Sequence, residues 1–386
     1  MDSSRDDVVE LASRLIECES VCPKDEGAQE IVATCLKAAG YEIEHLRVDG
    51  IPSLFASYGK KGPLFAFSGH SDVVPAGKAE EWATPPFKAV VRDGCLHGRG
   101  AIDMKGPMAA SVMAGVRFAS RRPADALPFR VAFMIAGDEE VLSNHGTKDL
   151  LALIESRNDA IQHCVVTEST SHKVLGDMAK IGRRGSIVGQ VTVKGVQGHS
   201  AYPHLASNPI SKSLPLLASL ANEDWGNGSD GFPPTSFQWT NLQAGTGAAN
   251  VIPGELYAVF NMRFSPELTV EAIKSRIEER LDSFGFEYSI KWTCDAFPFK
   301  TEEGILSQIV SDSIHGRTGI HPEFSTTGGT SDARFIAPTG AEVIEFGTLS
   351  HMCHQVDEHV SIADLDNLSL IYEDMLDRFA DHYSQA

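Results

Sequence analysis

The chain has 386 residues, of which 42% are hydrophobic and 22% are charged, with 33 basic and 52 acidic side chains. This length favours two domains, because a single hydrophobic core usually stops growing at roughly 250–300 residues. The composition excludes a largely disordered or fibrous chain, and a net charge of −19 without any Lys/Arg-rich run argues against binding to nucleic acid.

The first part of the chain alternates between helical and strand patterns. Apolar side chains at helical spacing predict two helices, over residues 8–16 and 27–40. Four apolar runs then predict strands, and helical segments such as MAASVMAGVRFA separate them. These runs are residues 63–67, 129–136, 164–166 and 341–346. The alternation predicts an α/β domain whose sheet is covered on both faces.

Between residues 186 and 294 the order changes to strand, helix, two strands, helix and strand. This β-α-β-β-α-β order is the ferredoxin-like pattern. We therefore predict a catalytic domain formed by residues 1–184 and 298–386, with residues 185–297 inserted as a smaller α+β domain. The outer strands of the inserted domain could pair with a second subunit, because an uncovered edge offers unpaired backbone groups.

The first 15 residues include acidic side chains and lack a basic segment followed by an apolar core, and no later stretch reaches the roughly 18 apolar residues of a membrane span. The seven cysteines are scattered and form no CxxC pair, which is typical of a reducing compartment. We expect a cytoplasmic protein that does not enter a membrane. Cys18 and Cys22 alone indicate a metal site only weakly, and buried thiols are the simpler interpretation.

Histidines and carboxylates follow several of the predicted strands directly, and one carboxylate precedes a predicted helix. These residues are His70, Asp103, Glu139, Glu140, Glu168 and His354. In an open α/β sheet, ligands bind in the crevice beyond the carboxyl ends of the strands. We therefore expect separate segments of the chain to bring these side chains to one place.

Two histidines with several carboxylates form a ligand set that zinc, cobalt or manganese accepts, and a carboxylate can bridge two such ions about 3.5–4 Å apart. Two ions fit this set better than one. Asp72 could accept the second imidazole N–H of His70 and so fix its tautomer. Each motif alone is more often a solvated surface pair, but adjacent like charges at the end of a buried strand are costly without a cation.

The chain also contains a series of motifs in a defined order: SGHSDVVPAG, WATPPF, GRGAIDMKG, AGDEE, GRRGS, GHSAYPHLASNP, GTGAANVIPGEL, FNMRFS, GGTSDARF and HQVDEHVS. Over residues 8–380 they resemble the bacterial succinyl-diaminopimelate desuccinylases, a branch of the two-zinc M20-type family of peptidases and deacylases. The first three motifs and the paired glutamates are shared across the wider family. GRRGS, GHSAYPHLASNP and GGTSDARF distinguish the desuccinylases from acetylornithine deacetylase, aminoacylase and carboxypeptidase relatives.

The resemblance implies an α/β fold with a mixed sheet, in which a two-zinc peptidase-like catalytic domain carries an inserted ferredoxin-like dimerisation domain. It implies two divalent ions per subunit, zinc in the first place and cobalt as the alternative. Asp103 would bridge the two ions, His70 and Glu168 would complete one site, and Glu140 and His354 would complete the other.

The resemblance also assigns roles around the metal ions. Glu139 would be the general acid/base, taking a proton from the attacking water and passing it to the leaving amine, with Asp72 as a further catalytic residue. The expected reaction releases succinate from N-succinyl-LL-2,6-diaminopimelate, in the synthesis of lysine and cell-wall precursors. His199, which would stabilise the oxyanion, and Asn250 would reach the active site of the partner in a homodimer.

Positions that hold substrate in the family are matched by Arg183, Ser186, Tyr202, Asn250, Arg263, Gly329 and Thr330. Arginines suit a substrate with several carboxylates, because the guanidinium group pairs with a carboxylate in bidentate fashion. An alternative for Arg183 or Arg184 is that it ties the two domains together.

Two departures from the family pattern affect local detail. Ala249 stands where Asn is frequent, and GDEEVLSNHGT replaces the usual GDEEG start. Three other functions stay open at this point: another N-acyl amino acid deacylase such as acetylornithine deacetylase, a two-metal aminopeptidase, and a non-catalytic metal-binding relative.

Overall fold

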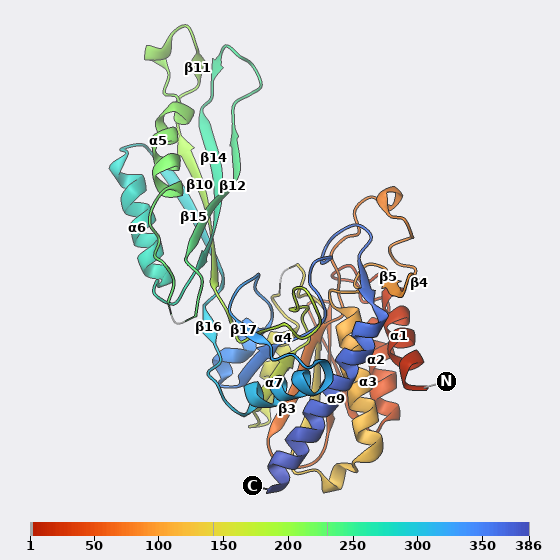
Figure 1. The fold of residues 1–386 in the computed structure, drawn as a ribbon. Helices are drawn as coiled ribbons and strands as arrows, with labels where there is room; N and C mark the ends of the chain where they lie inside the picture. Colours follow the sequence, from red (N-terminus) through yellow and green to blue (C-terminus); the bar gives the residue numbers. More distant parts are fainter. Residues whose placement is uncertain (1–2, 142, 230, 386) are drawn as a thin grey trace. The chain divides into compact units, whose positions relative to one another are not determined.

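The computed structural model describes residues 3–141, 143–229 and 231–385 (Figure 1). The chain divides into two compact units. The first comprises Met1–Ile181, Lys300–Ser325 and Ser331–Ala386, and the second comprises Gly182–Phe299 and Thr326–Thr330. The two main divisions fall after Ile181 and after Phe299, whereas the expected boundaries were 184/185 and 297/298. The sequence did not indicate that Thr326–Thr330 would group with the second unit.

The first unit is built on an eight-stranded mixed sheet with the strand order β1-β2-β6-β3-β7-β18-β8-β17. Its central strands β6, β3, β7 and β18 run parallel, whereas β1 and β2 pair antiparallel at one edge. The strands are β1 (Glu42–Val48), β2 (Ile51–Tyr58), β3 (Leu64–His70), β6 (Arg130–Ala136), β7 (Ile161–Val166), β8 (Met178–Lys180), β17 (Glu323–Ser325) and β18 (Glu342–Glu345). The predicted α/β class with a mixed sheet is confirmed.

Helices cover both faces of this sheet. Every residue of β3 is buried, and successive side chains of a strand point to opposite faces, so neither face is open to solvent at this strand. The helices of the unit are α1 (Ser3–Ile16), α2 (Ala28–Ala38), α3 (Lys105–Arg121), α4 (Thr147–Ser156), α7 (Ile305–Thr318), α8 (Ala333–Ile336) and α9 (Ile362–Gln385). α3 and α9 lie side by side, and Arg117 donates a hydrogen bond of 2.6 Å to Glu373 across them (Figure 1).

The four predicted strands of this unit correspond to β3, β6, β7 and β18. The hairpin of β1 and β2 was not predicted. β1 is largely exposed and charged, so it lacks the apolar run that identified the others, and its position is determined by pairing with the buried strand β2. Short elements complete the unit: η1 (Ala79–Glu81), η2 (Ala124–Ala126), η4 (Ala337–Thr339), and a small sheet of β4 (Val90–Arg92), β5 (Cys95–His97) and β19 (His359–Ser361).

The second unit has the element order β10, α5, β12, β14, α6, β15, which is the expected β-α-β-β-α-β pattern. Its four strands lie in the order β12-β14-β10-β15, and α5 and α6 pack on one face (Figure 1). Alternate side chains of β14 are buried, as in a strand with one covered face. The bounds are β10 (Gly185–Lys194), α5 (Pro209–Ala221), β12 (Ser236–Ala244), β14 (Glu255–Phe264), α6 (Val270–Ser283) and β15 (Tyr288–Ala296).

Smaller elements lie at the two ends of this sheet. β11 (Gly198–His199) pairs with β13 (Val251–Ile252), and η3 (Pro203–Leu205) follows β11. β9 (Gly182–Arg183) pairs with β16 (Phe299–Lys300) where the chain enters and leaves the second unit. Among the described residues no helix has both the length and the apolar character needed to cross a membrane.

Candidate metal centre

The parallel strands β6, β3 and β7 bring chemically active side chains to one edge of the large sheet. Because these strands are parallel neighbours, their carboxyl ends meet at the same edge. His70 is the last residue of β3, and the others follow β6 or β7 within a few positions. The predicted residues at this edge are His70, Glu139, Glu140 and Glu168.

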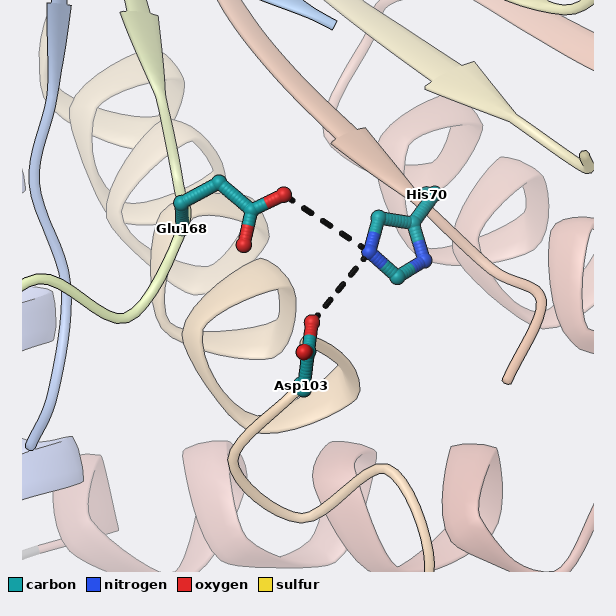
Figure 2. A group of neighbouring side chains, drawn as sticks. All are labelled: His70, Asp103 and Glu168. Carbon is teal, nitrogen blue, oxygen red and sulfur yellow. Dashed lines mark ion pairs between the residues drawn. The ribbon is translucent and has the colours of Figure 1, made fainter. Parts of the chain in front are cut away.

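The first ligand cluster consists of His70, Asp103 and Glu168 (Figure 2). Asp103 comes from the loop just ahead of α3. The Nε2 atom of His70 lies 3.3 Å from Oδ1 of Asp103 and 3.8 Å from Oε1 of Glu168, and the His70 side chain is 2% exposed. One potential ligand atom from each residue therefore lies within 4.8 Å of the others.

The second cluster consists of Asp103, Glu140 and His354. His354 lies in the loop between β18 and β19. Its Nε2 atom is 3.1 Å from Oδ2 of Asp103 and 3.1 Å from the Glu140 carboxylate. Asp103 thus directs one carboxylate oxygen to each cluster, which is the arrangement of a carboxylate that bridges two ions.

The carboxylates of this edge are crowded and withdrawn from water. Burial raises the pKa of Glu168 well above its ordinary value, and the charge of Asp103 raises it further. Burial also raises the pKa of Glu139 well above its ordinary value, by more than the nearby His70 lowers it. Such carboxylates ionise at neutral pH only when a positive charge compensates them.

The two histidines complete a donor set suited to divalent ions. Hydrogen bonds to Asp103 and Glu140 raise the pKa of His354 to about 10. Within the described part of the chain, the buried Nε2 of His70 makes no hydrogen bond of ordinary geometry, although two carboxylates lie close to it. A buried imidazole nitrogen that faces two carboxylates fits a metal ligand, so the residues present fit a dinuclear centre.

Asp72 contacts this centre in a different way from the one expected. The Nδ1 atom of His70 lies 2.9 Å from the backbone oxygen of Asp72 and 3.6 Å from its carboxylate. The Asp72 carboxylate instead accepts the backbone N–H groups of Glu139 (3.2 Å) and Glu140 (3.1 Å). Burial raises the pKa of Asp72 to about 6. The backbone of Asp72 therefore orients the imidazole, and its side chain holds the turn that carries both glutamates.

The segment GDEEVLSNHGT, which differs from the usual GDEEG start, still forms this turn. Asp138 closes the loop, because its carboxylate accepts the backbone N–H groups of Asn144 and His145, each at 3.0 Å, and its backbone oxygen accepts that of Ser143. Leu142 lies outside the described residues.

All the predicted substrate-binding residues belong to the second unit, where they form two groups. The first group lies at the start of β10: Arg183, Ser186 and Arg263, with the segment Thr326–Thr330. Ser186 pairs in register with Arg263 on β14, and Arg183 donates a hydrogen bond of 2.7 Å to the backbone oxygen of Thr327. Arg184 donates to the backbone oxygen of Pro234, also within the second unit.

The second group lies beyond the other end of β10, around β11 (Figure 1). The rings of His199 and Tyr202 are 5.6 Å apart, and the backbone oxygen of Asn250 accepts the N–H of Ser200 at 2.9 Å. All three predicted residues of this group are exposed. Ser186 and Lys194 are eight residues apart on one strand, so the two groups are separated by roughly 25 Å at about 3.3 Å per residue.

Comparison with known families decides where this chain belongs. Residues 66–378 match the peptidase family M20/M25/M40. The chain belongs to this family. Among M20 family relatives, the succinyl-diaminopimelate desuccinylase of Pseudoalteromonas atlantica is 47% identical over 372 residues, covering 96% of this chain and 98% of the relative. The desuccinylase of Thioalkalivibrio sulfidiphilus matches at the same identity and coverage, and that of Nitrosococcus oceani is 46% identical over 369 residues, with 96% and 98% covered.

Several solved structures share the fold. The M20 family metallo-carboxypeptidase Sso-CP2 of Sulfolobus solfataricus aligns with a TM-score of 0.82 at 16% identity, covering 99% of this chain and 100% of the other. Human carnosine dipeptidase 1 aligns with a TM-score of 0.79 at 18% identity, over 98% and 97% of the chains. The Bacillus subtilis YXEP protein, described as a dinuclear metal binding peptidase, aligns with a TM-score of 0.74 at 16% identity, over 99% of each chain.

Proposed function

We propose that the chain is a cytoplasmic, metal-dependent amide hydrolase that removes succinate from N-succinyl-LL-2,6-diaminopimelate. The other product is LL-2,6-diaminopimelate, a precursor of lysine and of the cell wall. The observation that carries the proposal is the pair of ligand clusters that share Asp103. The choice of substrate is supported by 47% identity, over 96% of the chain, to a protein named succinyl-diaminopimelate desuccinylase.

The proposed cofactors are two divalent ions per subunit, zinc in the first place and cobalt as the alternative. His70, Asp103 and Glu168 would hold one ion, and Asp103, Glu140 and His354 the other. When bound, such ions lower the pKa of water toward neutrality and polarise a carbonyl oxygen.

Glu139 is the proposed general base. The backbone N–H of Glu139 is anchored on Asp72, and the charges of His70, Glu168 and Glu140, which belong to the two clusters, act on the Glu139 carboxylate. A carboxylate with a raised pKa accepts a proton from the attacking water and afterwards donates it readily to the leaving amine. Glu140 and Glu139 thus have separate tasks although they are adjacent in the chain.

The group at the start of β10 is proposed to hold the substrate carboxylates. Ser186 and Arg263 are paired across β10 and β14, and Arg183 is fixed by its hydrogen bond to Thr327. The substrate carries several carboxylates, which planar guanidinium groups bind in bidentate fashion. Gly329 and Thr330 lie two and three positions after Thr327 and are proposed to complete this group.

We further propose a homodimer through the second unit. Ser186 lies near the start of β10 and the His199 group lies beyond its other end, so roughly 25 Å of strand separates the two groups, which is longer than a small substrate can span. If both groups serve catalysis, they act at different active sites, so His199, Tyr202 and Asn250 would serve the site of a partner subunit. There His199 would stabilise the oxyanion formed from the amide carbonyl.

The decisive experiment is a hydrolysis assay with three arms: N-succinyl-LL-2,6-diaminopimelate, N-acetylornithine, and an unblocked dipeptide. Each arm is run on the zinc-loaded enzyme, after chelation, and after zinc is restored. Fast release of succinate that chelation abolishes and zinc restores supports the proposal. Faster hydrolysis of N-acetylornithine or of the dipeptide would show that the chain has the activity of another branch of the family. No hydrolysis in any arm would refute the proposed hydrolase function.

A further inference from the structure

A buried ion pair bonds to the backbone of the two loops that carry Asp103 and His354. The carboxylate of Glu358 is 0% exposed and the side chain of Arg99 is 3% exposed, and they are joined by a hydrogen bond of 2.6 Å. The two residues are 259 positions apart in the chain. Neither side chain belongs to a ligand cluster.

The Glu358 carboxylate organises the loop ahead of α3. It accepts the backbone N–H groups of Gly100 (3.1 Å), Ile102 (2.8 Å) and Asp103 (3.1 Å). Gly100 has φ +87, a left-handed conformation that glycine adopts without strain and that lets the loop fold around the carboxylate. The backbone that carries Asp103 is therefore attached to Glu358 at three points.

Arg99 organises the loop that carries His354. Its guanidinium donates to the backbone oxygens of Gln355 (3.3 Å) and His354 (3.5 Å), and it lies 5.1 Å from the ring centre of Trp82. His354 has φ +62, which is costly for a residue with a side chain and persists only where the surroundings hold it. Arg99 supplies two of the contacts that do so.

We propose that Arg99 and Glu358 form a positioning pair that sets the separation of Asp103 and His354, and with it the affinity of the second cluster for its metal ion. This inference rests on the proposed metal-dependent function. His70 is the last residue of β3 and Glu168 lies two positions after β7, so the large sheet itself positions them. His354 lies on a loop between short elements and depends on the pair. The pair also explains why the WATPPF, GRGAIDMKG and HQVDEHVS motifs contain Trp82, Arg99 and Glu358, which are not ligands.

The test is a titration of metal-free enzyme with Co²⁺, followed by its visible absorption, and with Zn²⁺, followed by calorimetry. Three variants are compared with wild type: Glu358→Gln, Arg99→Lys, and the control Glu373→Gln, which breaks the ion pair with Arg117 between α3 and α9. Arg99→Lys keeps the charge beside Glu358 but loses the planar fork that reaches two carbonyls. It therefore decides the question if Glu358→Gln fails to fold.

Loss of a residue that orients metal ligands typically weakens metal binding by about 10–100-fold. We expect this loss for the second equivalent in Glu358→Gln and a smaller one in Arg99→Lys, each with an altered Co²⁺ spectrum. We expect the first equivalent to weaken less, and Glu373→Gln to match wild type. The positioning role would be overturned if Glu358→Gln and Arg99→Lys each bound two metal ions with wild-type affinity and gave the wild-type Co²⁺ spectrum. An equal loss in Glu373→Gln would also overturn it. Failure of the wild type to bind two ions would instead refute the proposed function itself.

Discussion

Replacement of Glu139 by glutamine separates the roles of the adjacent glutamates most sharply. The substitution keeps the size of the side chain and removes its capacity to accept and donate a proton. It leaves the backbone N–H of residue 139, which Asp72 holds, and both ligand clusters unchanged. Glu139→Gln should therefore bind two metal ions and hydrolyse substrate slowly.

The magnitude follows from the proposed role and from burial. General acid–base catalysis contributes typically 10²–10⁴-fold, so kcat should fall by that factor, or about 2.7–5.5 kcal/mol of barrier. The stability of the metal-free fold should instead increase. The Glu139 carboxylate is buried near Asp332 and Glu168, which raise its pKa further, so its ionised form destabilises the metal-free fold. The neutral variant should therefore have a higher Tm without metal at neutral pH.

The assay measures kcat, bound metal and the metal-free Tm of Glu139→Gln beside Glu155→Gln. The control removes the same charge from an exposed glutamate of α4 and should leave all three quantities unchanged. If metal-loaded Glu139→Gln keeps kcat within tenfold of wild type, Glu139 is not the base. A lower metal-free Tm would show that the buried carboxylate stabilises the fold, contrary to the electrostatic argument.

Three further predictions follow from the same geometry. The raised pKa values of Glu168 and His354, the latter about 10, mean that the metal-free fold binds more protons than the unfolded chain. The Tm of the metal-free protein, measured with chelator, should therefore fall as pH rises from about 6.5 to 9. A Tm that rises over this range would contradict the raised pKa values. Arg263→Lys should raise KM about 10–100-fold through loss of a bidentate contact, with a smaller change in kcat; unchanged KM for the succinylated substrate would remove Arg263 from the binding group. His199→Ala and Glu139→Gln subunits, each nearly inactive, should recover about a quarter of wild-type activity when refolded together. Half of the dimers then contain one subunit of each variant, and one of their two active sites combines an intact Glu139 with an intact His199. No recovery of activity would argue against a shared site.

Local sequence patterns were sufficient for much of the fold. Apolar runs identified β3, β6, β7 and β18, and the order of elements identified the ferredoxin-like insertion, because strand and helix periodicity depends on residues a few positions apart. The strand β1 escaped these patterns because an exposed edge strand carries no apolar run, and its pairing with the buried strand β2 was therefore not predicted. The grouping of Thr326–Thr330 with the second unit escaped them too, since it depends on contacts with Arg183 and Gly231, which are distant in the sequence.

The candidate site shows the same division between local and distant information. The sequence by itself determined which residue types follow the strand ends, and strand polarity then brings His70 and Glu168 to one edge. Only the tertiary structure decided that Asp103 directs one oxygen to each cluster, that the Asp72 side chain holds the Glu139 turn, and that Glu358 anchors the Asp103 loop. Each of these contacts joins segments tens to hundreds of residues apart, so its geometry depends on how the whole unit packs and not on the spacing of residues within any motif.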